Sequence, residues 1–195
     1  MVKHLTRPIA CLAGLLAIGA AGCASIPGKT RAQQEDSIQN LVDRTLTDLY
    51  RQHPKAKEEM QTAVGYAIMN NKITKIPVFG VGAGYGVAVR SSTQDKTYLR
   101  MRRFDIGAGW GARGLRPVAI FQDEAVFDRF IKGKIEITMG AEAAAKVGET
   151  GAAGGGTADQ ALKNRGFTSY LLTDAGVSAT ATAAVIRVKP IQLKK

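Results

Sequence analysis

Hydrophobic and polar positions alternate along the middle of the chain, from Val78 to Phe121. In the first half of this stretch one parity is apolar, and the other is glycine at Gly80, Gly82, Gly84 and Gly86. A period of two is typical of an extended strand. Glycine in a strand costs about 0.5–1 kcal/mol relative to alanine, so four of them predict a close approach to the backbone. Two interpretations of the approaching group stay open: a helix that covers the sheet, or an acyl chain bound in a groove.

The second half repeats the alternation after a polar loop over residues 91–96. One parity holds the glycines Gly107, Gly109 and Gly111, and the other holds Tyr98, Arg100, Arg102 and Trp110. Two such strands joined by a short polar loop predict an antiparallel hairpin. Residues 115–121 predict a third strand, which Pro117 places at an edge of the sheet because proline donates no ladder hydrogen bond.

Three helices are predicted outside this stretch. Apolar residues recur at spacings of three and four across residues 32–52, which indicates a helix. Pro54 suits the first position of a second, short helix over residues 55–63. Asp123 is placed to cap a third helix, which Gly133 ends.

Further extended segments complete the predicted sheet, at residues 64–69, 135–139, 167–173 and 177–188. Turns are expected at residues 70–72 and 174–176, and a flexible loop at residues 151–156. The predicted fold class is α+β, with N-terminal helices packed on a twisted, barrel-like antiparallel β-sheet and one short internal helix.

The N-terminus has the form of an export signal. Lys3 and Arg7 precede an apolar run over residues 9–21, which is too short to span a bilayer but suits the core of a signal peptide. It ends in Ala20-Ala21-Gly22-Cys23, which resembles a bacterial lipobox. An ordinary signal peptide with an incidental cysteine is the alternative. The lipobox interpretation predicts acylation of Cys23, for example with palmitate, and anchoring in the outer membrane facing the periplasm.

These features divide the chain into four parts: a lipoprotein signal peptide at 1–22 that is removed, an acylated N-terminus and tether at 23–31, a domain at 32–190, and a basic tail at 191–195. The 195 residues suit one domain plus a targeting segment. The formal charge of +11 favours anionic partners such as phospholipid head groups.

Residue patterns for catalysis and cofactor binding are weak. The run from Gly109 to Gly114 matches GxGxxG, but a strand rather than a helix follows it, which disfavours a dinucleotide site. His53 is the single histidine that remains after signal removal, which is too few for a histidine-based metal site or triad. We expect no catalytic residue, no metal and no cofactor. Nucleic acid is also not expected as a partner, because an exported, lipid-tethered protein seldom meets it.

Basic residues gather within and beside the central hairpin, and they form the candidate site. Guanidinium groups bind phosphate bidentately, and tyrosine and tryptophan suit the head-group boundary of a membrane. The predicted lipid-binding residues are Arg90, Arg100, Arg102, Arg103 and Arg113 with Tyr85 and Trp110. The alternative interpretation is a strand edge that carries charge to prevent aggregation.

Four segments together resemble the bacterial SYLF-domain lipoproteins, over residues 41–190. They are His53-Pro54-Lys55-Ala56, Gly82-Ala83-Gly84-Tyr85-Gly86-Val87-Ala88, Phe104-Asp105-Ile106-Gly107-Ala108-Gly109-Trp110-Gly111 and Val118-Ala119-Ile120-Phe121. The resemblance implies non-catalytic lipid binding. Related eukaryotic domains bind phosphoinositides through a basic N-terminal segment, whereas the long helix here is slightly acidic. Met69-Asn70 also replaces an aromatic–proline pair, so the resemblance implies a general preference for phospholipid.

A structural role is the second hypothesis. In this case the glycine-rich sheet packs against an identical copy, giving a homo-oligomer, or against another envelope protein. A sheet that spans the membrane is disfavoured, because arginine occurs on both parities of the hairpin and is costly toward lipid.

Overall fold

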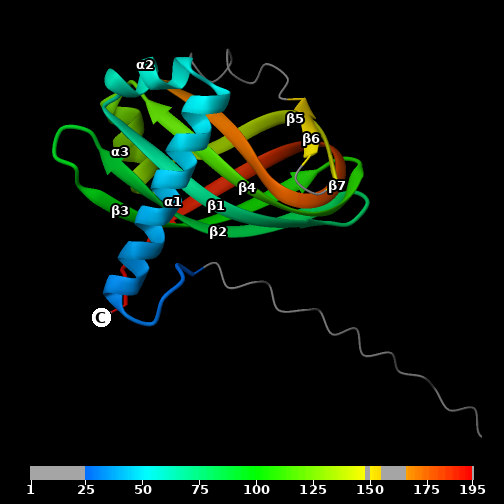
Figure 1. Ribbon diagram of the computed structural model, residues 1–195, viewed down its shortest axis with the longest axis horizontal. Helices are drawn as coiled ribbons and strands as arrows, with labels where there is room; N and C mark the ends of the chain where they lie inside the picture. The colour runs from blue at the N-terminus through cyan, green and yellow to red at the C-terminus, as the bar shows by residue number, and fades with distance from the viewer. Residues whose placement is uncertain (1–24, 148–149, 155–165, 195) are drawn as a thin grey trace, which may run out of the picture.

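The computed structural model describes residues 25–147, 150–154 and 166–194 (Figure 1). Within these ranges the chain forms three helices and seven strands, in the order α1 (Arg31–Gln52), α2 (Lys55–Gln61), β1 (Gly65–Lys75), β2 (Phe79–Arg90), β3 (Lys96–Ile106), β4 (Gly109–Phe121), α3 (Glu124–Ile131), β5 (Glu136–Val147), β6 (Thr150–Gly154) and β7 (Phe167–Pro190). The helix predictions are confirmed, with each boundary within two residues at the start and end.

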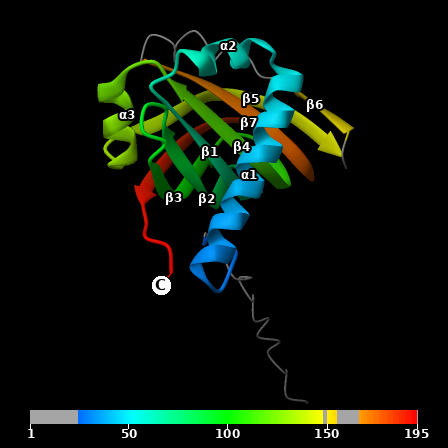
Figure 2. The same ribbon diagram turned by 60° about the vertical axis from the view of Figure 1, so that its left-hand side comes forward.

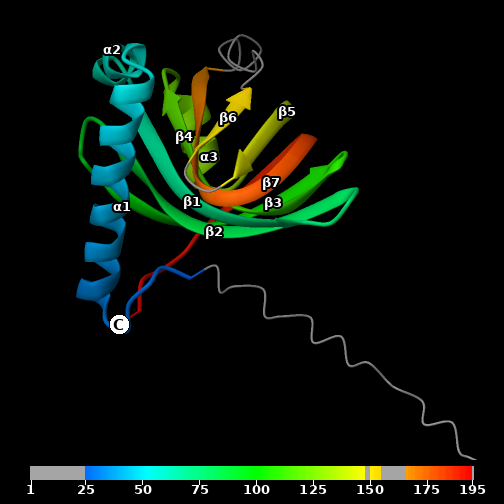
Figure 3. The same cartoon turned by 45° about the vertical axis from the view of Figure 1, so that its right-hand side comes forward.

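The strands form one antiparallel sheet in the order β3-β2-β1-β4-β7-β5-β6, which confirms the α+β class. β7 pairs with β4 along its first part and with β3 along its last part. The sheet therefore curls strongly (Figure 3), with β6 lying beyond β5 at the end of the order. "Barrel-like" describes this curl only loosely.

Each face of the sheet packs against a helix. α1 stands against the outer, convex side (Figure 3), where Leu41 and Leu49 pack with Ile68, Val87 and Val118. On the inner, concave side, α3 closes one end of the sheet (Figure 2). There Phe127 and Phe130 join a cluster of buried aromatic and aliphatic side chains that includes Phe121 and Phe167. The alternating side chains of the strands therefore contribute to two hydrophobic cores, one on each face of the sheet, and neither face is bare.

The capping residues explain where the helices begin and end. Thr30 and Gln33 form a reciprocal capping box at the start of α1. His53 ends that helix, because the residue before a proline disfavours helical geometry. Asp123 accepts a hydrogen bond from the backbone of Val126 at the start of α3, as predicted.

One predicted turn and one predicted strand start in the first half of the sheet are wrong. β1 continues through residues 70–72 to Lys75. The chain also turns at residues 107–108, so the strand that begins at Leu115 in the prediction starts at Gly109 instead. The longer strand is more stable because most of the added residues of β1 gain partners in both β2 and β4.

Pro117 lies in a central strand, not at an edge, since β4 pairs with both β1 and β7. The ladder to β1 runs from Phe121 to Val118 and resumes at Leu115. Pairing is therefore interrupted where proline has no N–H to donate. The sheet accommodates the proline through this local gap.

The predicted turn at residues 174–176 is also wrong, because β7 is one continuous strand of 24 residues. Its pairing with β4 shifts register between Arg113 and Leu115, opposite this segment. A β-bulge bends a strand without ending it. The Asp-Ala-Gly sequence therefore marks the bend.

The C-terminal residues 191–194, within the predicted basic tail, are docked on the domain. The backbone N–H of Ile191 donates to the carbonyl of Tyr98 at 2.9 Å. The N–H of Lys194 donates to Oε1 of Gln34, also at 2.9 Å. Ile191 and Leu193 pack against the core beneath α1. The end of the chain is thus fastened to β3 and to the first turns of α1.

Candidate functional site

The register of the β2–β3 hairpin divides the predicted arginines between the two faces of the sheet. Arg100 lies opposite Tyr85 and Arg102 opposite Ala83, on the convex face. Arg103 lies opposite Gly82, on the concave face. Because neighbouring residues of a strand point to opposite sides, Arg102 and Arg103 cannot serve the same surface.

Arg100 and Arg102 are exposed. Arg102 is flanked by β2 on one side and Arg187 of β7 on the other, and Arg100 lies opposite Lys189. Lys72 of β1 lies across Ala83 from Arg102. We use the term basic belt for the exposed residues Lys72, Arg100, Arg102 and Lys189.

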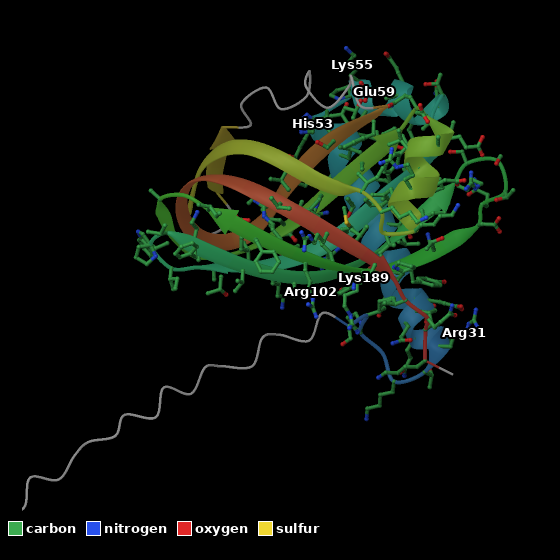
Figure 4. The ribbon with its side chains drawn as sticks, turned by 180° about the vertical axis from the view of Figure 1, so that it is seen from behind. Arg31, His53, Lys55, Glu59, Arg102 and Lys189 are labelled. Atoms are coloured by element: carbon green, nitrogen blue, oxygen red, sulfur yellow. The ribbon has the colours of Figure 1, made fainter. Side chains whose placement is uncertain are left out.

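No acidic residue of β1, β2 or β3 shares this face. Asp105 is the one carboxylate in these three strands, and it is buried on the concave side. The basic belt therefore presents positive charge without a neutralising strand partner. Such an arrangement attracts phosphate groups in solution or on a surface. Figure 4 shows Arg102 and Lys189 close together on this side of the molecule.

Arg103 is not a surface residue, and its placement in the lipid-binding set is wrong. Its side chain is 0% exposed. Its Nε donates to Oδ1 of Asp105 at 2.7 Å, and its Nη2 donates to Oδ2 at 3.2 Å. A buried charge requires such a partner because desolvation is costly. The guanidinium is therefore held by its own strand.

Arg90 is likewise committed to an internal contact. Its Nη1 donates to Oε1 of Glu124 at 2.7 Å, and its Nη2 contacts the carboxylate of Asp128. Its guanidinium carbon lies 4.9 Å from the ring centroid of Phe127. The hydrogen bond from Arg90 lowers the pKa of Asp128 below its ordinary value of 3.8. Arg90 therefore clamps α3 to β2 rather than receiving phosphate.

Arg116, beside the predicted set, holds α1 on the sheet. It is 8% exposed and lies between two carboxylates. Its Nη2 donates to Asp48 of α1 and its Nε donates to Asp174 of β7, both at 2.7 Å. A third hydrogen bond, of 3.4 Å, reaches the hydroxyl of Thr45. Arg113 lies in β4 opposite Ile73, and its side chain is outside the described part of the structure.

The two predicted aromatic residues differ in exposure. Tyr85 is half-buried against the core beneath α1, and its hydroxyl accepts a hydrogen bond of 3.2 Å from Nδ2 of Asn70. Trp110 is 61% exposed at the start of β4. Trp110 is therefore available to a partner, whereas Tyr85 supports the sheet.

The glycines of β2 do meet a close neighbour, and for Gly82, Gly84 and Gly86 that neighbour is β1. A Cβ on Gly84 would overlap the carbonyl oxygen of Asn70, and a Cβ on Gly86 would overlap that of Ile68. Gly82 is approached by Asn71, and Gly80 by the side chain of Asp105. The bare backbone thus lets the sheet curl onto itself. It does not leave a groove for an acyl chain at these positions.

The glycines after β3 have a different role from the one predicted. Gly107, Gly109 and Gly111 have φ angles of 137°, 146° and 127°, a region that side chains with a Cβ rarely adopt. Gly107 lies in the turn that precedes β4, and Gly109 and Gly111 are the first and third residues of that strand, where the backbone conformation rather than a close approach favours glycine. Gly107 and Gly109 donate backbone hydrogen bonds to Val78 and Pro77, which joins this turn to the β1–β2 turn.

The structure adds a feature that the sequence analysis missed. Seven large hydrophobic residues in the described part of the chain are exposed, each between 50% and 65%. All lie at the joined turns or on the adjoining ends of strands. We use the term apolar tip for them: Ile76, Val78, Phe79, Val81, Phe104, Ile106 and Trp110.

A sequence signal for the apolar tip does exist. Phe104 and Ile106 share the parity of Arg100 and Arg102, so they must point to the same face. The apolar parity of β2 runs along the whole strand, from Val81 to Val89. α1, however, reaches only its Val87 half. Comparing the length of β2 with the length of strand that one helix can cover predicts that the end of β2 near Val81 is exposed.

Three other observations complete the description of the site. Among the described residues, no group of three or more His, Cys, Asp or Glu side chains is placed to hold a metal ion. No helix in this part of the chain is long and apolar enough to cross a membrane. Cys23, the predicted acylation site, lies outside the described residues.

Comparison with known proteins gives a similarity to one named relative and no family model. No family model matches the chain. The chain is similar to the protein named Beta cell expansion factor A of Aeromonas veronii, with 31% identity over 159 residues. The match covers 78% of this chain and 58% of that protein, so the chain spans somewhat more than half of the relative's length.

Proposed function

We propose that this protein is a non-catalytic, SYLF-type phospholipid-binding lipoprotein of the bacterial cell envelope. In this proposal the acylated Cys23 anchors it in the outer membrane, facing the periplasm. The exposed Arg100 and Arg102 then receive the phosphates of anionic phospholipids. Arg90 and Arg103 are left out of the site because their guanidinium groups already form ion pairs with carboxylates of the same chain.

The observation that carries the proposal is the basic belt on a face to which β1, β2 and β3 contribute no acidic residue. Exposed arginine that lacks an ion-pair partner keeps its fork of donors available for phosphate. Each basic residue near an anionic bilayer contributes about 1 kcal/mol of attraction, and salt screens it. The convex face is therefore suited to a charged lipid surface.

Removing two charges from the basic belt is expected to weaken vesicle binding. In the full chain carrying Cys23→Ser, so that no acyl chain contributes, Arg100→Gln/Arg102→Gln should reduce affinity for anionic vesicles by about 30-fold, since two charges are worth about 2 kcal/mol. Flotation with vesicles of phosphatidylglycerol and phosphatidylcholine measures this. Rising salt should release the parent protein.

The matched control is Lys55→Gln/Lys57→Gln, which removes the same charge from exposed positions on α2. Lys55 lies at the opposite side of the molecule from Arg102 (Figure 4). This variant should bind nearly as well as the parent. Equal losses in both variants would mean that net charge alone drives binding, and equal retention on neutral vesicles would contradict the proposal.

Acylation has its own test. When labelled palmitate is supplied to cells that express the protein, the label should become attached to the protein. Cys23→Ser should abolish this incorporation, because the sulfur of Cys23 is the atom modified. Cys11→Ser serves as the matched control and should leave the label in place. Label that persists in the Cys23→Ser variant would rule out this anchor.

A further inference from the structure

We infer that the apolar tip is a membrane-insertion surface, which enters the bilayer interface ahead of the basic belt. The inference rests on the proposed function and deepens it, because it names a second contact with lipid and fixes how the domain stands on the membrane. Its occupant is an anionic phospholipid surface.

The first argument is the concentration of exposed apolar side chains. The seven large hydrophobics exposed in the described part of the chain all belong to the apolar tip. Scattered exposed apolar residues are normal, but a contiguous exposed patch marks an interaction surface. The patch is also held together, because Gly107 and Gly109 donate hydrogen bonds of 3.0 and 3.1 Å to the β1–β2 turn.

The second argument is the order of residue types along the strands. On the convex face, Val81 pairs with Phe104, the next pair inward is Ala83 with Arg102, and the next is Tyr85 with Arg100. Successive pairs on one face are about 7 Å apart. A tip buried about 5–10 Å into the interface would therefore bring the guanidinium groups to the level of the phosphates.

The third argument is the position of Trp110 and of the first described residues of the chain. Tryptophan favours the membrane–water boundary, and Trp110 is exposed beside the joined turns. The described chain begins beneath β2, on the same convex side (Figures 1 and 3). A tether that leads to a membrane from this side would hold the basic belt toward that membrane.

Charge distinguishes a bilayer from a second copy of the chain. A symmetric dimer through the apolar tip would bring two basic belts near each other, and like charges at an interface are repulsive. Anionic lipid instead offers apolar chains to the tip and phosphate to the belt. Both parts of the surface are then satisfied at once.

The chain contains one tryptophan, so Trp110 reports on the apolar tip directly. In the full chain carrying Cys23→Ser, addition of vesicles of phosphatidylglycerol and phosphatidylcholine should shift its emission to shorter wavelength. Lipid brominated near the head group should quench it. Phe79→Ser/Phe104→Ser should lower vesicle affinity at least tenfold, whereas Phe79→Leu/Phe104→Leu should retain binding. Circular dichroism and urea unfolding check that each variant is folded.

Flotation and fluorescence separate the two proposals. Binding to anionic vesicles without a change in Trp110 emission, and without loss in the serine variant, would overturn insertion and leave head-group binding standing. Absence of binding would overturn both. An emission shift that depends on protein concentration alone, with a dimer mass by light scattering, would assign the apolar tip to a second copy and reject the inference.

Discussion

Replacing Arg116 with methionine is expected to lower the free energy of unfolding by about 3–5 kcal/mol, because two carboxylates would then face each other at a mostly buried position. Arg116 bridges Asp48 of α1 and Asp174 of β7, each at 2.7 Å. Methionine fills much of the space but donates no hydrogen bond. Urea unfolding followed by circular dichroism measures the loss.

Arg51→Met is the matched control, because Arg51 contacts the same carboxylate, Asp48, at the same 2.7 Å. The side chain of Arg51 is 72% exposed, against 8% for Arg116. Exposed ion pairs contribute about 0–1 kcal/mol, so this variant should unfold almost like the parent. Similar losses in the two variants would show that burial of the bridge is not what matters.

Substitution of Gly86 by alanine is expected to destabilise the protein by about 3 kcal/mol or more. The added Cβ would overlap the carbonyl oxygen of Ile68, which is backbone and cannot rotate away. Relief therefore requires moving β1 or β2 in the middle of the sheet. Overpacking of a filled interior costs about 1–3 kcal/mol, and a rigid neighbour places this site at the upper end.

Gly80→Ala tests the same strand and the same face with a softer neighbour. A Cβ there would lie 3.1 Å from Cβ of Asp105, a side-chain contact that a few tenths of an ångström would relieve. We expect a change within about 1 kcal/mol, since alanine also restricts the unfolded chain. Equal free energies of unfolding for the two variants would contradict the view that the close approach of β1 requires glycine at position 86 of β2.

Residue patterns predicted most of the fold, because the periods of two and of three to four reflect burial directly. The alternation in β3 separates exposed Arg100 and Arg102 from buried Leu99 and Met101, as the structure confirms. The turns were less predictable. Pro117 and the Asp-Ala-Gly segment at residues 174–176 have local preferences for edges and turns. Pairing on both sides of their strands outweighs these preferences.

Whether an arginine forms an internal ion pair depends mostly on partners that are distant in the sequence. Arg90 meets Asp128, 38 residues away, and Arg116 meets Asp48, 68 residues away. No local pattern identifies such pairs. Arg103 is the exception, since Asp105 follows two residues later on the same buried parity. An internal ion pair was predictable there from strand geometry alone.

Strand β7 and the residues after it complete the hydrogen bonding of β3, of β4 and of Gln34, which lies 160 residues before Lys194. A chain that is made with its N-terminus first therefore holds three unsatisfied strand edges, on β3, β4 and β5, until β7 pairs with them. Such edges are templates for aggregation. The order of the strands thus makes the pairing of β7 the folding step that closes these edges.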